Sequence, residues 1–219
     1  MHLERKRQIQ QNLQQAHLLQ RLRQVPRKRY LSFNFINTIF ISSFFHSISV
    51  PKKIQILIIG HNESGTTPET AKLAYETGME VAKSGAVLIT GGLEGVMKAA
   101  CHGAKDAGGL TVGIIPQNEP SFANEYCDIV IPSGMGLARD FLNALSADGV
   151  IMIGGGSGTL SETCAAYMYK KPIVAIKNSG GVAEKYADQY LDHRKSVLII
   201  GVSSPKEAVK VILEKIRAT

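Results

Sequence analysis

The stretch Gly149-Val-Ile-Met-Ile-Gly-Gly-Gly-Ser-Gly-Thr-Leu-Ser-Glu162 joins an apolar run, a glycine cluster and the start of a helical pattern. Val150–Ile153 predicts a buried strand, and the apolar residues at helical spacing after the glycines predict a helix. Glycine lets the chain turn tightly and lets a ligand approach the backbone. The helix start adds unpaired N–H groups and a positive dipole end, so we expect a phosphate site here. The alternative is a plain strand-to-helix turn in which Glu162 only favours the helix N-terminus.

The rest of the body repeats this order of strand, loop and helix six or seven times. The expected strands are 53–59, 86–90, 110–115, 128–131, 150–153, 172–176 and 197–200, and the main expected helices are 67–84, 96–107, 137–147 and 204–217. The alternation predicts an α/β fold with a doubly wound (Rossmann-like), mostly parallel sheet. Ligands of such sheets bind at the carboxyl ends of the strands, where the strand order switches. Every glycine cluster follows a strand, so all of them are expected at that edge.

Charge is distributed unevenly along the 219 residues. The whole chain has a formal net charge of +7, but residues 1–53 alone hold ten Lys and Arg against one acid. The remainder holds 15 basic and 17 acidic residues, so the body lacks the basic face of a nucleic-acid-binding domain and we expect no nucleic-acid partner. Three scattered cysteines without zinc-type spacing fit a reducing compartment, which predicts a cytoplasmic protein with no metal site.

Residues 1–50 differ in composition from residues 51–219, which form the predicted single domain. Residues 1–30 are rich in Gln and Arg, whereas residues 31–50 contain no Lys, Arg, Asp or Glu. The first interpretation is a disordered extension or a start placed too early. The second is a targeting or membrane-anchor segment, although polar residues interrupt the roughly twenty apolar residues that a spanning helix needs. A membrane partner is expected only if this extension is natively made, and limited proteolysis should leave a core beginning near Lys52.

A second glycine loop, Gly91-Gly-Leu-Glu-Gly-Val-Met97, follows another predicted strand. It either holds a further part of a nucleotide or allows close packing of a helix on the sheet, and composition does not decide between them. Neither glycine loop is a P-loop, because no Gly-Lys-Ser/Thr follows. Lys177 stands where a dinucleotide-binding fold carries an acid, so NAD binding is not expected.

Arg139 lies near the start of a predicted helix that runs antiparallel to the strand 150–153. This placement brings it towards the carboxyl end of that strand, beside the glycine loop and Glu162. A guanidinium there suits bidentate contact with phosphate, but from spacing alone a surface ion pair with Asp140 or Glu125 is the simpler interpretation. The hydroxyls of Ser157 and Thr159 likewise suit either phosphate binding or helix capping.

Together these motifs resemble the Lonely Guy (LOG), or lysine-decarboxylase-like, superfamily. Its signature consists of GGxxGxM, an Arg on a helix, and PGGxGTxxE, which match Gly91–Met97, Arg139 and Gly154–Glu162. Arg139 precedes the third motif by 15 residues, as in the family. Gly103–Pro116 and Leu191–Arg194 resemble a Rossmann-fold branch related to molybdenum cofactor carrier proteins.

The resemblance implies one of two functions. The first is binding of a phosphate-bearing nucleotide or a nucleotide-like cofactor, such as molybdenum cofactor. The alternative is cleavage of a nucleoside 5′-monophosphate into free base and ribose 5-phosphate, an N-glycosidic hydrolysis with Arg139 and Glu162 as catalytic residues. The implied ligand contacts are Gly91, Gly92, Gly95, Gly154, Gly155, Gly156, Ser157, Gly158 and Thr159. Since LOG proteins pair through helices near the site, a homodimer or higher homo-oligomer is also implied.

The sequence departs from the LOG signature in three places. Gly154 replaces a proline, Ser161 replaces an acid, and Asp140 replaces a basic residue after the Arg. The last two departures change the expected charge of the pocket. They count against hydrolysis while leaving phosphate binding in place, so catalysis stays open between the two functions.

Overall fold

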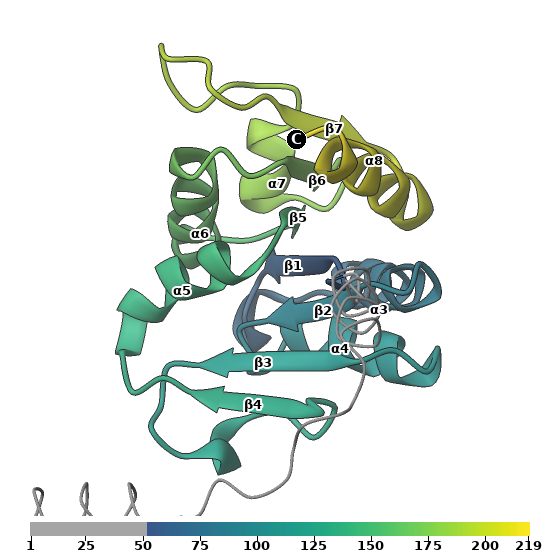
Figure 1. Cartoon of the computed structure of the whole chain (residues 1–219), viewed down its shortest axis with the longest axis vertical. Coiled ribbons are helices and arrows are strands. Elements are labelled where there is room, and N and C mark those ends of the chain that lie inside the picture. The colour runs from purple at the N-terminus through teal and green to yellow at the C-terminus, as the bar shows by residue number, and fades with distance from the viewer. Residues whose placement is uncertain (1–51) are drawn as a thin grey trace, which may run out of the picture. The chain divides into compact units, whose positions relative to one another are not determined.

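The computed structural model describes residues 52–219, and the expected extension and its apolar stretch lie outside the described residues (Figure 1). The strands are β1 (Gln55–Gly60), β2 (Val87–Thr90), β3 (Thr111–Ile115), β4 (Ile129–Pro132), β5 (Gly149–Ile153), β6 (Ile173–Ile176) and β7 (Ile199–Val202). They form one parallel sheet in the order β4-β3-β2-β1-β5-β6-β7. The expected doubly wound α/β fold is therefore confirmed.

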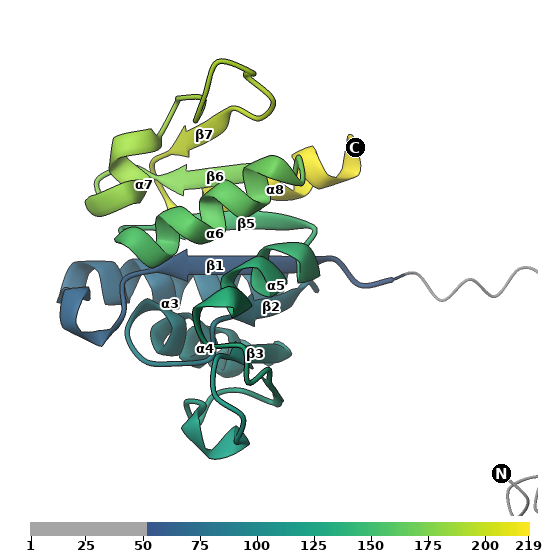
Figure 2. The same ribbon diagram turned by 90° about the vertical axis from the view of Figure 1, so that its left-hand side faces the viewer.

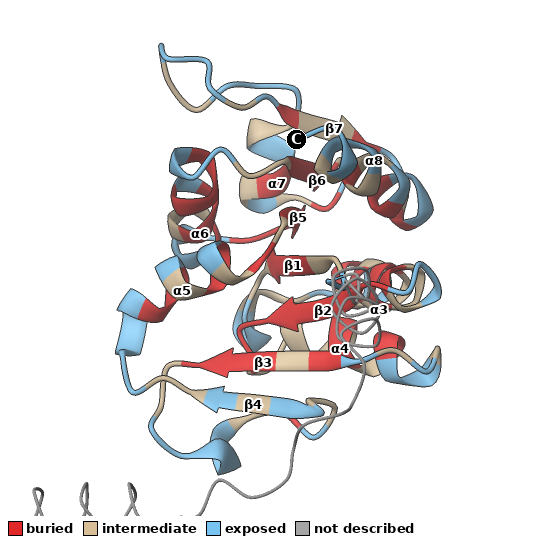
Figure 3. Cartoon of the chain, viewed as in Figure 1, coloured by how far each residue is buried: buried red, intermediate tan, exposed pale blue. Residues whose placement is uncertain are grey.

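Helices cover both faces of the sheet (Figures 1 and 2). One face carries α3 (Pro68–Lys83), α4 (Val96–Asp106) and α8 (Pro205–Arg217), and the other carries α5 (Arg139–Ser146), α6 (Ser157–Met168) and α7 (Gly181–Tyr186). Along β1, Ile56 and Ile58 pack into the first layer while Leu57 and Ile59 pack into the second. Because both layers need apolar side chains, the central strands are continuous apolar runs, and only the edge strand β4 is substantially exposed (Figure 3).

Local signals explain where several elements begin. Thr67 caps α3 in a reciprocal capping box with Thr70, and Pro68 opens the helix, as its sequence predicts. The helix expected from residue 137 instead begins as a 3₁₀ turn, Gly136–Ala138, and becomes α-helical at Arg139. The last strand lies two residues later than expected, because β7 pairs with β6 from Ile199 onward. Among residues 52–219, no helix is long and apolar enough to cross a bilayer.

The strand order switches direction at β1 and β5. From β1 the chain first builds β2, β3 and β4 on one side, and α5 then carries it back to β5 on the other side of β1. Gly60 at the end of β1 pairs with Ile153 at the end of β5. The loops that follow these two residues therefore leave the sheet side by side, at the place where doubly wound folds bind ligands.

Candidate ligand-binding site

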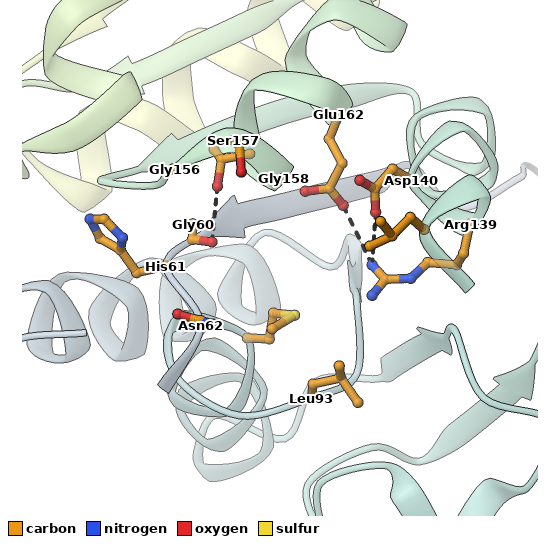
Figure 4. Close-up of a pocket in the computed structure, with 13 residues that line it drawn as sticks. Gly60, His61, Asn62, Leu93, Arg139, Asp140, Gly156, Ser157, Gly158 and Glu162 are labelled. Carbon is orange, nitrogen blue, oxygen red and sulfur yellow. Dashed lines mark hydrogen bonds and ion pairs between the residues drawn. The ribbon is translucent and has the colours of Figure 1, made fainter. Parts of the chain in front are cut away.

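A cavity of about 300 Å³ opens at this switch point (Figure 4). Its volume is at the lower end of the range for small-molecule sites. Six residues expected at the site line it: Arg139, Gly156, Ser157, Gly158, Thr159 and Glu162. Seven further residues complete the wall: Gly60, His61, Asn62, Leu93, Met97, Leu137 and Asp140. The cavity thus joins the end of β1, the second glycine loop and the starts of α4, α5 and α6.

The start of α6 presents free backbone to this cavity. Gly156 is the N-cap residue, and no side chain caps the helix within the described residues. A Cβ atom built on Gly156 or Gly158 would meet nothing within 4 Å, so both face open space. The unpaired N–H groups and the dipole of this 12-residue helix therefore point to a place that an anion can reach.

Gly154 and Gly155 shape the turn behind this wall instead of lining it. Their φ angles are +60° and +99°, in the left-handed region that favours glycine. The Gly154 N–H donates to Ser179 Oγ at 2.8 Å, and a Cβ on Gly155 would lie 2.4 Å from Thr159 Oγ1. A proline has φ fixed near −65°, so the residue of the LOG signature does not fit this backbone at position 154.

The second glycine loop also acts mainly through packing. Gly92 and Gly95 adopt φ angles of +70° and +74° and approach neighbouring backbone closely. Gly91 lies against the site itself, because a Cβ there would be 2.5 Å from Arg139 Nη1 and 2.7 Å from Met97 Sδ. None of the three glycines lines the cavity, but Gly91 makes room for the guanidinium that does.

Arg139 is buried, with 8% of its surface exposed. Its Nη1 lies 3.6 Å from Asp140 Oδ1 and 3.7 Å from Glu162 Oε1, so both contacts are ion pairs longer than hydrogen bonds. The buried Nε has no partner within residues 52–219. Of the two partners expected for a surface ion pair, Asp140 does pair with Arg139, but the pair is buried, and Glu125 pairs with Lys98 instead. A buried guanidinium with unused donors is suited to receive an anionic ligand.

Glu162 lies beside Arg139, five residues into α6. Burial, as the largest cause, and the charge of Asp140 together raise the pKa of its carboxyl to about 7. A 2.7 Å hydrogen bond from Asn143 Nδ2 and the charge of Arg139 act in the opposite direction. The carboxyl therefore titrates near neutral pH, which suits a group that holds or transfers a proton.

Asn143 contacts a residue of the candidate site, and the motifs do not reveal it. It is fully buried on α5, four residues after Arg139, and its amide holds the Glu162 carboxylate. Residues four apart share a helix face, so the spacing from Arg139 is the signal that points to it. The amide was not identifiable from the LOG signature alone, since that signature fixes only the Arg on this helix.

Two polar residues of α6 have roles other than those expected. The Thr159 hydroxyl donates a hydrogen bond to the Gly60 carbonyl at 2.9 Å, so this hydroxyl connects α6 to β1. Its contribution to an anion site would come from its backbone. Ser161 does not line the cavity, so this departure from the LOG signature does not alter the pocket's charge, whereas Asp140 does.

Comparison with known proteins agrees with this architecture. The model of the SLOG cluster4 family matches residues 53–209. An uncharacterized protein of Archaeoglobus fulgidus is 42% identical over 126 residues, which is 58% of this chain and 82% of that protein. The cytokinin riboside 5′-monophosphate phosphoribohydrolase of Mycobacterium tuberculosis is 32% identical over 122 residues, which is 52% of this chain. The alignment spans 65% of the mycobacterial enzyme, just under two thirds of its length.

Solved structures give a consistent result. The molybdenum cofactor binding protein of Rippkaea orientalis superposes with a TM-score of 0.67 and 36% identity, covering 76% of this chain and 99% of that one. The molybdenum cofactor carrier protein of Chlamydomonas reinhardtii gives 0.66 and 32%, covering 77% and 100%. A DNA processing protein A from Helicobacter pylori, which binds single-stranded DNA, shares the fold at 22% identity and a TM-score of 0.56. That last likeness concerns the fold alone.

Proposed function

The chain belongs to the SLOG cluster4 family, and from this premise we propose that its cavity binds a phosphate-bearing nucleotide or nucleotide-like cofactor, as a carrier protein does. The observation that carries the proposal is Arg139. Its guanidinium is buried at the cavity wall, and within the described residues its Nη1 makes two ion pairs, both longer than hydrogen bonds. Burying a charged group with unused donors is costly unless a ligand supplies the missing acceptors. An oxygen of the ligand's sugar or ring would be the acceptor for this guanidinium, with the phosphate at the start of α6.

The length of α6 supports a ligand with a phosphate at one end and a sugar-like group next to it. Ser157 opens the helix and Glu162 lies five residues later, roughly 7.5 Å along its axis. Phosphate held at the helix start would leave the following ring beside Glu162 and Arg139. Leu93 and Met97 add apolar surface for a flat heterocycle. Two structural relatives, whose names say that they bind or carry molybdenum cofactor, support the same class of ligand.

A second function is favoured by one specific observation, the raised pKa of Glu162 beside Arg139. In hydrolysis of a nucleoside 5′-monophosphate, a carboxylate facing the ribose would stabilise positive charge at C1 or orient the attacking water. The mycobacterial relative carries the name of such an enzyme. Glu162→Gln should then lower base release about a hundredfold or more and change affinity little. We place carrier-type binding first, because Asp140 adds a second carboxylate to the pocket.

Incubation with a panel of nucleoside 5′-monophosphates tests both functions together. The full chain is melted with each monophosphate and with its nucleoside, while free base is assayed by chromatography. Stabilisation by monophosphates without base release supports the carrier function, and base release selects the hydrolase. If no base appears, and neither a nucleoside monophosphate nor 6-hydroxymethylpterin monophosphate raises the melting temperature, both proposals are wrong.

Small molecules are the partners that this site would serve. Residues 54–219 hold 15 basic and 17 acidic residues, so they lack the excess of positive charge that nucleic-acid-binding domains carry. We therefore retain the expectation that nucleic acid is not a partner. A fluorescence anisotropy titration with labelled single-stranded DNA at physiological salt checks this, because binding at micromolar protein would contradict it.

A further inference from the structure

Asp140 is the one carboxylate of the cavity that lacks a hydrogen-bond partner within residues 52–219. Glu162 accepts from Asn143, whereas the nearest cation to Asp140 is Arg139 Nη1 at 3.6 Å. Asp140 is 8% exposed and lines the cavity, on the same side as Arg139 and apart from Gly156 and Ser157 in Figure 4. Within the described residues neither carboxylate oxygen is both unpaired and sealed from solvent, so a ligand in the cavity that Asp140 lines can reach this carboxylate.

The part of the ligand that lies beside Asp140 should therefore carry hydrogen-bond donors. An ionised carboxylate only accepts, and its two oxygens suit two parallel N–H donors. One guanidinium serves two carboxylates here, and its contacts to both are longer than hydrogen bonds. An anionic group at this end of the cavity would be repelled by Asp140. The phosphate consequently belongs at the start of α6, and a donor-rich part of the ligand belongs beside Asp140.

We propose that Asp140 selects a phosphorylated heterocycle whose edge carries a ring N–H next to an exocyclic amino group. This edge is shared by guanine and by pterins, and its two donors match the two oxygens of one carboxylate. Adenine has the amino group without an adjacent ring N–H, and hypoxanthine has the ring N–H without the amino group. The inference rests on the proposed phosphate-binding function and names the class of ring that the same cavity accepts.

The alternative role for Asp140 is to neutralise Arg139 without touching a ligand. That role predicts no dependence of affinity on the donor pattern of the ring. A site built to hydrogen-bond a donor pair, in contrast, rejects analogues that lack one donor, because its own acceptor is left unpaired. The ranking of related ligands therefore separates the two roles.

Calorimetric titrations of the full chain with GMP, IMP, AMP and 6-hydroxymethylpterin monophosphate give this ranking. GMP or the pterin phosphate should bind at least about tenfold more tightly than IMP and AMP. Whichever of the two binds more tightly identifies the source of the shared edge. Equal affinities for GMP, IMP and AMP, with no preference for the pterin phosphate, would overturn the inference while leaving phosphate binding intact. No binding by any of the four would defeat the proposed function itself.

Asp140→Asn provides the matched test, because it keeps the shape of the side chain and removes its charge. The variant should lose the preference for GMP or the pterin phosphate and bind AMP within about twofold of the parent. Asp106→Asn, at an exposed residue of α4, is the control and should keep the parent's ranking. A preference that survives Asp140→Asn contradicts the inference. If that variant does not fold, the ranking measured on the parent decides alone.

Discussion

At the scale of single residues, the chemistry of the cavity comes from burial. Arg139, Asp140 and Glu162 are each 8% exposed, so their charges interact strongly and any unpaired one is costly. Asn143 holds one carboxylate, and Arg139 lies between both. The contacts within this cluster leave Arg139 and Asp140 without a close hydrogen bond to each other or to Glu162. This is the physical reason to expect a ligand there.

Glu162 should make folding stability depend on pH. A carboxyl whose pKa is about 7 when folded, against roughly 4.3 unfolded, binds its proton more tightly in the native state. Its contribution to stability is present at pH below the unfolded value and is lost as pH rises through 7. The parent should therefore lose more melting temperature between pH 5 and pH 8 than Glu162→Gln does.

Melting curves at these two pH values, with Glu214→Gln as the control at an exposed site on α8, check this prediction. The control should behave like the parent. An identical loss of melting temperature in the parent and in Glu162→Gln would mean that this carboxyl does not titrate as its burial requires.

Thr159→Val should weaken the fold more than it weakens phosphate binding. The lost hydroxyl bonds the Gly60 carbonyl, so removing it should cost about 1 kcal/mol of unfolding free energy. Thr159→Ser, which keeps the hydroxyl, should restore most of that loss. Denaturant unfolding gives the stability and calorimetry gives the phosphate affinity. If Thr159→Val has unchanged stability but much lower phosphate affinity, the prediction is wrong. The hydroxyl would then bind the ligand, as the LOG resemblance implies.

At the scale of elements, the start of α6 is the proposed phosphate site, and glycine substitutions separate its role from that of the second glycine loop. Gly158→Ala adds a methyl group towards open cavity, so stability should be unchanged or up to about 1 kcal/mol higher while affinity for a monophosphate falls. Gly91→Ala should lower both, because its Cβ collides with Arg139 and Met97. Thermal melts and calorimetry of the two variants check this. Unchanged monophosphate affinity in Gly158→Ala would move the phosphate away from α6.

Most helices and strands were predictable from the sequence, but the different structural roles of the individual glycines were not. The start of α3 follows from Thr67 and Pro68, and the buried strands follow from their apolar runs. In contrast, Gly155 is needed because its φ is +99°, whereas Gly158 leaves open space for a ligand. Both are simply glycine in the sequence, so the sequence does not tell the two roles apart. The position of β7 depends on its pairing with β6, which local periodicity does not contain.

At the scale of the whole molecule, large apolar side chains are exposed on α5, on the turn before it and at the end of α6. Leu137, Phe141 and Leu145 recur every four residues and are 88%, 49% and 46% exposed, and Met168 on α6 is 63% exposed. Residues four apart share a helix face, so Leu137, Phe141 and Leu145 lie along one face of α5 and of the turn before it, and α6 packs beside α5 (Figure 2). Such a face fits the homo-oligomer that the LOG resemblance implies.

Self-association through this face is testable by light scattering. The parent should have at least a dimeric mass at micromolar concentration, and Phe141→Glu should shift it towards the monomer because a charge in an apolar interface is costly. Phe122→Glu, at a side chain 56% exposed outside this face, should leave the mass unchanged. A monomeric parent, or a Phe141→Glu variant with the parent's mass, would contradict the prediction.

The alternation of strands and helices predicted the parallel sheet and the edge at which the cavity lies, because parallel strands bring all their carboxyl ends to one edge. The burial of Arg139 did not follow. Spacing favoured a surface pair, and only the packing of α5 over Gly91 shows how the guanidinium is enclosed. The central claim is that a phosphate-bearing ligand fills the cavity, with its phosphate at the start of α6 and its ring beside this enclosed guanidinium.

Calorimetric titration of GMP, AMP and their nucleosides into the parent, Arg139→Met and Arg217→Met tests that claim most directly. Methionine approximates the length of the arginine stem, and Arg217 is exposed on α8. At least one monophosphate should bind the parent about tenfold or more tightly than its nucleoside, and Arg139→Met should weaken monophosphate and nucleoside alike while Arg217→Met weakens neither. Equal binding of monophosphate and nucleoside by the parent, or unchanged affinities in Arg139→Met, would contradict the account.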